Sequence, residues 1–240
     1  MSAWSELLSY LPAAIHRRLR RAYSRHRATM SQIGQDLWVY GEVFNEKRGG
    51  YFVDVGAFNG VVLSNTFLLE ARYGWRGLCI EPNPASFSRL VRERSATCLQ
   101  VCLDRVEGEV LYVDRGLASG IVDENMDNKP GSVVAGEIPA RVSTRTLASV
   151  LREANAPNTI DYLSIDCEGG EERILGSFPF GEYVFCCITV ERPSANLREV
   201  LAGAGYLLVK EVPGLDAFYV HRFFRENYVE NALKFWARYA

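Results

Sequence analysis

The chain has 240 residues, of which 48% are hydrophobic and 23% are charged. This composition is typical of a globular protein with one large core, and it excludes a disordered, collagenous or small disulfide-rich protein. The formal net charge of −2 provides no general attraction to nucleic acid, so we expect no nucleic-acid partner. The charge is unevenly distributed, because residues 1–30 carry +5 and the remaining 210 residues carry −7.

Residues 1–30 are predicted to form a basic, amphipathic helical extension. Apolar residues recur at helical spacing from Trp4 to Leu19, and a cluster of arginines follows, although Pro12 interrupts the stripe. The arginines follow the apolar residues instead of preceding them, which argues against a signal peptide. Packing on the domain, on a second copy in a homodimer or over the active site is favoured over peripheral contact with an anionic membrane.

The six cysteines lie mostly in apolar runs, where a small buried side chain fits. No pair has the spacing of a zinc site with a histidine nearby. The cysteines therefore indicate reduced thiols and a cytoplasmic location. No apolar run approaches the ~20 residues needed to cross a bilayer.

From residue 50 onward, apolar runs of strand length alternate with amphipathic runs of helical length. The predicted strands are 51–55, 77–81, 97–102, 160–165, 183–190, 206–211 and 217–221. The predicted helices are 63–73, 84–94, 145–154, 169–175, 195–203 and a final docked helix over 223–240. This alternation predicts an α/β fold in which helices cover both faces of a parallel sheet.

Two segments depart from the alternation. Residues 109–114 are predicted to form a short extra strand or hairpin. Residues 115–137 contain four glycines and little periodicity, which predicts a long loop. Long loops in compact domains are usually functional or disordered, so we expect this loop to contribute to acceptor selection.

The first element that indicates chemistry is the apolar run 51–55 followed by a glycine-containing turn. Asp54 ends the run, and Gly56 and Gly60 allow the backbone to approach a ligand at the carboxyl edge of the sheet. The turn lacks the Gly-x-Gly-x-x-Gly pattern that cradles a pyrophosphate. It therefore favours a nucleoside ligand without phosphates.

Glu81 ends the second predicted strand, 27 residues after Asp54. This is close to the spacing at which an acid meets ribose hydroxyls in nucleoside-binding folds, and a carboxylate accepts two hydroxyl hydrogen bonds. The alternative is that Glu81 only caps the helix that begins near Pro84. The combined pattern favours the ribose role.

Asp166 and Glu168 follow the apolar run 160–165 at the same edge of the sheet. Acids here also suit a helix N-terminus, which is the structural alternative. Three acids within six residues exceed what capping needs, so we expect at least one of them to bind a ligand or take part in catalysis.

Five segments together resemble the FkbM-type S-adenosylmethionine-dependent methyltransferases, within the class I Rossmann-like methyltransferases. They are SQIGQD at 31–36, FVDVGAFNG at 52–60, LSNT at 63–66, GWRGLCIEPNP at 74–84 and IDYLSIDCEGGE at 160–171. The resemblance covers residues 31–222 and leaves 1–30 and 223–240 outside it. It implies a seven-stranded, mostly parallel sheet whose last strand is antiparallel, with helices on both faces.

The resemblance also implies S-adenosylmethionine as the cofactor. Asp54, Gly56 and Gly60 would lie beside its methionine part, and Glu81 would hold its ribose. The other implied cofactor-binding residues are Gln32, Gln35, Asp36, Ala57, Asn59, Asn65, Pro82, Asn83, Cys102, Leu103, Asp104 and Asp166. Of these, 102–104 would border the adenine, and the residues upstream of the sheet would close over cofactor or acceptor.

The family is associated mainly with O-methylation, so the expected acceptor is a hydroxyl of a sugar, glycan or other natural product. Methyl transfer requires in-line alignment and removal of the acceptor's proton. The candidate bases are Asp166, Glu168, Glu191 and His221. The first three could instead hold a divalent cation such as Mg²⁺ that activates the hydroxyl.

Two other functions remain as alternatives at this point. A nicotinamide-dependent oxidoreductase would use a similar sheet, but the missing phosphate-loop glycines argue against it. A membrane-docked, non-catalytic binding module would explain the basic segment 1–30 but not the full set of site residues. The basic residues Arg115, Lys129, Arg141 and Arg145 could recognise an anionic acceptor, although solvated surface positions are favoured.

Overall fold

The computed structural model describes residues 29–133 and 137–238. The predicted helical extension over 1–30 lies outside the described residues except for Thr29 and Met30, and its packing, membrane contact and role in a homodimer stay predictions. Among the described helices, none combines the length and the apolar character that crossing a membrane requires.

A seven-stranded sheet forms the centre of the molecule, in the order β10-β11-β9-β8-β1-β2-β3. Neighbouring strands are parallel except for β11, which is antiparallel to both β9 and β10. The strands are β1 (Tyr51–Val55), β2 (Arg76–Ile80), β3 (Thr97–Leu99), β8 (Thr159–Ile165), β9 (Val184–Glu191), β10 (Tyr206–Glu211) and β11 (Asp216–His221). The predicted sheet, with its antiparallel last strand, is confirmed.

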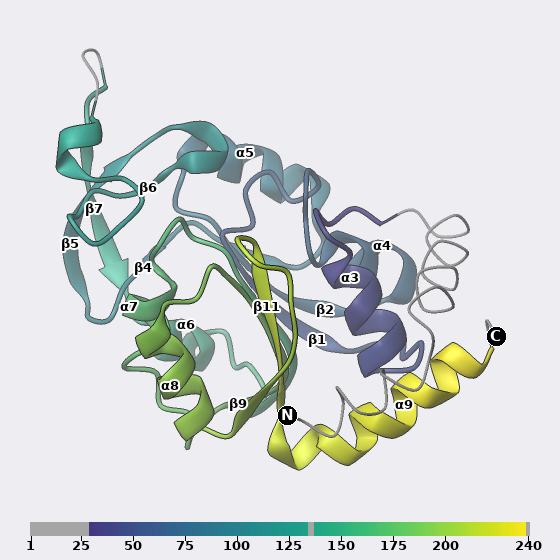
Figure 1. The fold of residues 1–240 in the computed structure, drawn as a ribbon. Coiled ribbons are helices and arrows are strands. Elements are labelled where there is room, and N and C mark those ends of the chain that lie inside the picture. The colour runs from purple at the N-terminus through teal and green to yellow at the C-terminus, as the bar shows by residue number, and fades with distance from the viewer. Residues whose placement is uncertain (1–28, 134–136, 239–240) are drawn as a thin grey trace.

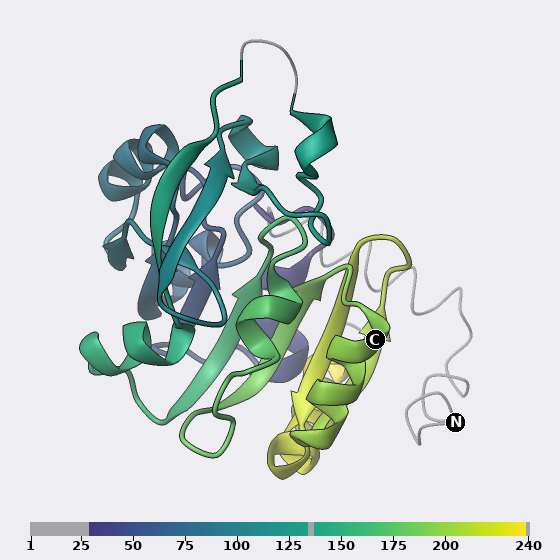
Figure 2. The same ribbon diagram turned by 90° about the vertical axis from the view of Figure 1, so that its left-hand side faces the viewer.

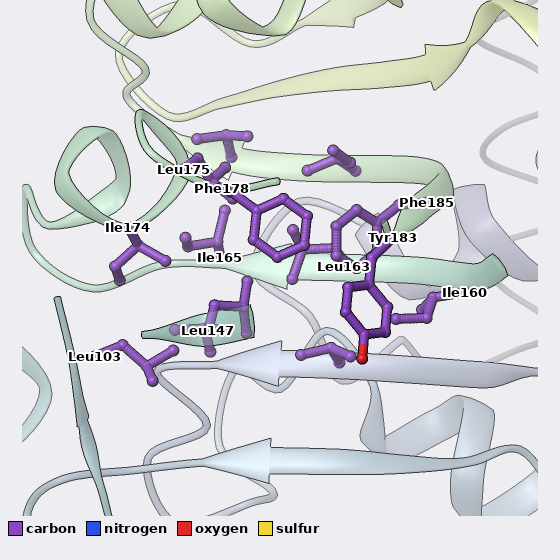
Figure 3. Close-up of a cluster of buried hydrophobic side chains, with 14 of the residues drawn as sticks. Leu103, Leu147, Ile160, Leu163, Ile165, Ile174, Leu175, Phe178, Tyr183 and Phe185 are labelled. Atoms are coloured by element: carbon purple, nitrogen blue, oxygen red, sulfur yellow. The ribbon is translucent and has the colours of Figure 1, made fainter. Parts of the chain in front are cut away.

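Alternate side chains of the strands enter two cores, because successive residues of a strand point to opposite faces. In β1, Phe52 packs in one core and Val53 in the other. Figure 3 shows the second core, where Leu163 and Ile165 of β8 meet Phe178 and Phe185. Burial on both faces explains why these strands are nearly continuous apolar runs in the sequence.

Helices cover both faces of the sheet, with α6, α7 and α8 on one side and α3, α4 and α9 on the other (Figure 1). Their bounds are α3 (Gln35–Leu37), α4 (Phe67–Tyr73), α5 (Pro84–Glu93), α6 (Leu147–Glu153), α7 (Glu171–Leu175), α8 (Ala195–Gly203) and α9 (Arg225–Ala237). Side-chain caps fix three of the starts: Asn83 for α5, Thr146 for α6 and Ser194 for α8 each accept a backbone N–H.

A second, four-stranded sheet lies beside the first, in the order β4-β7-β5-β6. Its strands are β4 (Cys102–Leu103), β5 (Gly108–Val113), β6 (Gly120–Ile121) and β7 (Ala140–Arg145). Figure 2 shows it in teal above the main sheet. It has its own small core, which contains Tyr112, Ile121 and Met126.

This small sheet was only partly predicted. The extra strand expected over 109–114 is β5, and its hairpin partner β6 lies inside the predicted loop 115–137. That segment also contains the short helices η2 (Gly116–Ala118) and η3 (Pro130–Ser132). Strand β7 was missed because most of its side chains are exposed or half-buried, so the sequence lacks a strong alternating pattern there.

The C-terminal helix packs on the segment that precedes the sheet. That segment is α3 continued by the π-helix η1 (Trp38–Val43), and α9 follows the short helix η4 (Arg222–Phe224). Tyr228 and Phe235 of α9 are buried, and the Phe235 ring lies so close to Gly41 that a Cβ there would be 2.5 Å away. Helix α9 therefore packs against η1 through its buried aromatic side chains.

Candidate active site

A cavity opens at the carboxyl ends of β1, β2, β8 and β9. This is the edge at which open α/β sheets bind ligands. One wall comes from the turns that follow these strands, and another comes from the small sheet and the segment 116–126. The cavity therefore joins parts of the chain that are far apart in sequence.

Asp54 lies at the end of β1, lines the cavity and is only 4% exposed. Its carboxylate accepts a hydrogen bond from Thr66 Oγ1 at 2.5 Å and lies 3.8 Å from the Arg94 guanidinium. Burial raises the pKa of Asp54, while Arg94 and Thr66 oppose that shift.

Arg94 does not line the cavity itself, but it holds the turn after β1 in place. Its side chain is fully buried, and Nε lies 2.5 Å from Glu70 Oε2. It also donates to the Gly60 carbonyl at 3.2 Å and to Thr66 Oγ1 at 2.9 Å. Because five N–H groups diverge from one planar cation, a single arginine can hold both ends of the turn.

Two glycines of the turn have different roles. Gly56 has φ +83°, and a Cβ there would lie 1.8 Å from the Asp166 carbonyl oxygen, so the backbones that follow β1 and β8 approach each other directly. Gly60 has φ +81° and packs against Arg94 Cγ, 2.7 Å from the position of a Cβ. Gly56 shapes the cavity, whereas Gly60 permits the contact with Arg94.

Glu81 follows β2 and accepts two backbone hydrogen bonds, from Phe58 and Asn83, both at 2.8 Å. It lines the cavity, and burial raises its pKa to about 7. The cap of α5 is Asn83, which accepts from Ala85 N and Ser86 N. Asn83 therefore caps the helix. The Glu81 carboxylate keeps further lone pairs that can accept hydrogen bonds from a ligand.

Asp166, Glu168 and Glu191 meet at one end of the cavity, where one oxygen of each lies within 4.8 Å of the others. Burial, then the charge of Glu191, raises the pKa of Asp166 to about 9 and that of Glu168 to about 7. Arg192 contacts Glu191 at 3.0 Å and Glu168 at 3.4 Å. We refer to these three acids as the acidic cluster.

His221 and Asp216 lie at opposite ends of β11. Since β11 is antiparallel, its first residue, Asp216, pairs in register with Glu191, while His221 lies at the other edge of the sheet. Asp216 is 5% exposed and accepts a hydrogen bond from Gln35 Nε2 at 2.9 Å. The strand direction places the His221 ring near Ala204 O, away from the cavity, so the structure does not bring this predicted base to the site.

A family profile described as the methyltransferase FkbM domain matches residues 54–208, which is more than half of the chain. The chain belongs to this family. The match runs from the end of β1 to the start of β10, leaves out β11, and includes Asp54, Glu81 and the acidic cluster. Together with the strand order, it identifies the fold as that of a class I methyltransferase.

Three solved structures are similar at low sequence identity. The methyltransferase FkbM from Methylobacillus flagellatus KT is 14% identical, with a TM-score of 0.45 over 71% of this chain and 43% of its own. A TehB-like SAM-dependent methyltransferase from Corynebacterium glutamicum is 12% identical, with a TM-score of 0.40 over 88% and 100%. The METTL16 methyltransferase domain is 13% identical, with a TM-score of 0.44 over 78% and 65%. Curated protein sequences contain no match.

Most of the predicted site residues line the cavity. They are Gln32, Gln35, Asp54, Gly56, Ala57, Asn65, Glu81, Pro82, Cys102, Leu103, Asp166, Glu168 and Glu191. Their convergence follows from the topology, because parallel strands bring their carboxyl ends to one edge.

Six predicted site residues do not line the cavity: Asp36, Asn59, Gly60, Asn83, Asp104 and His221. Asp36 accepts hydrogen bonds from Thr29, Met30 and Ser31 and so fixes the start of the described chain. Asn59 accepts from the backbone of its own turn. Asp104 is paired with Arg173 at 2.6 Å, which joins β4 to α7. The side-chain polar groups of Asp36, Asn59 and Asp104 are therefore already used by contacts within the fold.

Several lining residues were not predicted individually, although three of them lie in the loop 115–137 that was expected to contribute to acceptor selection. Tyr112, Gly120, Ile121 and Met126 reach the cavity only because the small sheet folds over it. Ser164 was overlooked on β8, although it faces the same way as Asp54, with which it pairs in register. Its hydroxyl accepts from Asn65 Nδ2 at 2.9 Å.

The acidic cluster fits a hard divalent cation in its donor chemistry, since three carboxylates are ligands that Mg²⁺ accepts. Arg192, however, already provides positive charge to Glu168 and Glu191. A bound cation would have to displace this guanidinium or share the acids with it. The donor atoms alone therefore do not favour a metal over the arginine that is present.

Proposed function

We propose that this protein is an S-adenosylmethionine-dependent O-methyltransferase that acts on a hydroxyl of a sugar, glycan or other natural product. The observation that carries the proposal is the convergence of Asp54, Glu81 and the acidic cluster on one cavity of a methyltransferase fold. Acids at three strand ends suit a ligand with a ribose diol and positive charge.

The cavity fits the cofactor in both its polar and its apolar parts. Glu81 presents a carboxylate to a diol, and Ile80, Val101 and Leu103 supply an apolar wall for a purine. Asn65 is buried, and its Oδ1 has no hydrogen-bond partner among the described protein atoms. A buried carbonyl without a partner is costly, so a ligand donor such as an ammonium group would satisfy it.

S-adenosylmethionine supplies an electrophilic methyl group when it is bound. The chain's own residues must then hold the acceptor in line and remove the hydroxyl proton. We assign Glu168 as the base, because it lines the cavity and its pKa of about 7 lies near the operating pH. Asp166, with its pKa near 9, retains its proton until positive charge is bound beside it.

Isothermal titration with S-adenosylhomocysteine tests the cofactor assignment. We expect binding to the folded protein, at least tenfold weaker binding to a Glu81→Gln variant, and no binding of NADH. Absence of heat with S-adenosylhomocysteine, or binding of NADH instead, would contradict the proposal and favour the oxidoreductase. Transfer of a labelled methyl group to sugars and natural products then tests the hydroxyl acceptor.

Chelation tests whether Mg²⁺ at the acidic cluster activates the hydroxyl instead of a protein base. Loss of turnover in EDTA, with recovery on addition of Mg²⁺, would support the metal. Turnover that is unchanged by EDTA but falls in Glu168→Gln would support Glu168 as the base.

A further inference from the structure

The charged side chains that line the cavity are all acidic. They are Asp54, Glu81, Asp166, Glu168 and Glu191, and none of the described lining residues is lysine, arginine or histidine. A cationic cofactor would offset some of this charge, but the acidic cluster is the part left to face an acceptor. Asp166 keeps its proton, but Glu168, Glu191 and the neighbouring Asp127 share a single cation, Arg192, so this group of side chains stays net negative and repels a phosphate or carboxylate.

The nearby arginines are already paired with acids of the chain. Arg192 lies 2.6 Å from Asp127 and also contacts Glu168 and Glu191. Arg115, next to the cavity-lining Gly116, forms a 2.6 Å ion pair with Glu137. Both guanidiniums are therefore already engaged with carboxylates of the chain, which compete with an anionic ligand.

Exposed aliphatic side chains surround the same cavity. Val62, Leu63 and Leu117 line it, yet they are 48%, 47% and 52% exposed. Leu63 has φ +57°, a backbone conformation that leucine rarely adopts, and its backbone pairs with Ser31. We call these three residues the apolar rim.

Exposed apolar side chains next to a binding cavity indicate that the ligand brings apolar surface of its own. The rim comes from two separate segments, the turn after β1 and the short helix η2 between β5 and β6. A small, fully hydroxylated sugar would leave it in contact with water.

We infer that the acceptor is uncharged and carries an apolar portion beside the methylated hydroxyl, as in a glycolipid or an alkyl or aryl glycoside, and that anionic sugars are not acceptors. This inference rests on the proposed methyl transfer, and it specifies the acceptor class for that reaction. The acidic cluster excludes the anions, and the apolar rim receives the apolar portion.

Three matched probes test the inference on the full chain saturated with S-adenosylhomocysteine. Octyl β-D-glucoside has the apolar group, methyl β-D-glucoside lacks it, and octyl β-D-glucuronide adds a carboxylate. By calorimetry below the micellar concentration, we expect octyl glucoside to bind at least tenfold more tightly than either of the others. Equal binding of methyl glucoside or of the glucuronide, or no binding of octyl glucoside, would overturn the inference.

Failure of the proposed function is separable from failure of this inference. If S-adenosylhomocysteine itself does not bind, the cofactor assignment fails. If it binds and the order of the three glycosides differs from that expected, only the acceptor class fails.

A variant of the rim provides the second readout. In Leu117→Ser, the ratio of octyl to methyl glucoside affinity should fall about threefold or more, whereas Leu233→Ser, which alters an equally exposed leucine on α9, should leave the ratio unchanged. If Leu117→Ser lowers the unfolding temperature and leaves the ratio unchanged, another part of the chain or a second copy covers the rim, and the inference is wrong.

Discussion

The two walls of the cavity are held by different interactions. The wall formed by the turn after β1 depends on Arg94, whose guanidinium is fully buried and contacts Asp54, Glu70 and Thr66. The wall formed by the small sheet depends on Arg173, which is 21% exposed and bridges Asp104 and Asp123. We call them the Arg94 wall and the Arg173 wall.

This difference indicates that the two walls tolerate substitution differently. A buried charge network tolerates little change, because loss of one partner leaves another charge uncompensated. The Arg173 pairs reach solvent through Arg173 and Asp123, and partly exposed pairs contribute less to stability. Side chains of the Arg173 wall can therefore change at a lower cost in stability than those of the Arg94 wall.

The largest effect is expected from Arg94→Met. Removing the guanidinium leaves Asp54 and Glu70 buried without their partner, which should cost about 3–5 kcal/mol of unfolding free energy. Urea unfolding monitored by circular dichroism measures this. Arg92→Met, on an exposed position of the same helix, is the matched control and should change stability by less than about 0.5 kcal/mol.

The next effect concerns the proposed base. Glu168→Gln keeps the shape of the side chain but cannot accept a proton, so kcat should fall about 10²-fold to 10⁴-fold. Binding of S-adenosylhomocysteine, measured by calorimetry, should change little. If Glu168→Gln has a normal kcat, Glu168 is not the base, and Glu191 becomes the candidate.

The pH dependence of the rate should report the same group. Because the pKa of Glu168 is raised to about 7, its basic form is gained as pH rises, and kcat/KM should increase between about pH 6 and 8. The residual rate of Glu168→Gln should lack this rise. A profile that is flat from pH 6 to 8 in the wild-type protein would argue against Glu168.

The stability of the ligand-free protein should fall as pH rises, whereas kcat/KM should increase. Glu81 and Asp166 have raised pKa values in the folded protein, about 7 and about 9, so the fold binds more protons than the unfolded chain above about pH 4.5. The unfolding temperature should therefore fall as pH rises from about 5 to 9. The Glu81→Gln, Asp166→Asn double variant should show a weaker dependence in scanning calorimetry.

The smallest effect is expected on the Arg173 wall. Arg173→Ala should lower the unfolding free energy by only about 1–2 kcal/mol, because its ion pairs are partly exposed. Urea unfolding, as for Arg94→Met, measures this change. A loss as large as that of Arg94→Met would remove the distinction between the two walls.

Residue patterns predicted much of this molecule. The apolar runs located all seven strands of the main sheet, because strands buried on both faces must be apolar along their length. Asp54, Glu81 and Asp166 were located because each lies at the end of such an apolar run or directly after it. The small sheet was largely missed, since its strands are short and half-exposed, and β7 carries few buried side chains.

His221 illustrates the limit of reasoning along the chain. A histidine at a strand end is a reasonable base only if that end faces the cavity, and β11 is antiparallel. The same reversal brings Asp216 to the cavity edge, beside Gln35. Strand direction was expected from the resemblance, but its consequence for each side chain appears only when the register is known.

The sequence by itself determined the family, the order of the main elements and the acids at the strand ends, because these depend on local periodicity and on motif spacing. Only the tertiary structure decided which polar groups remain for a ligand. Asn83 and Asp104 are used as a helix cap and an ion-pair partner, while Glu81 keeps its access to the cavity. The physical reason is that a buried polar group must be paired, and its partners are often distant in sequence.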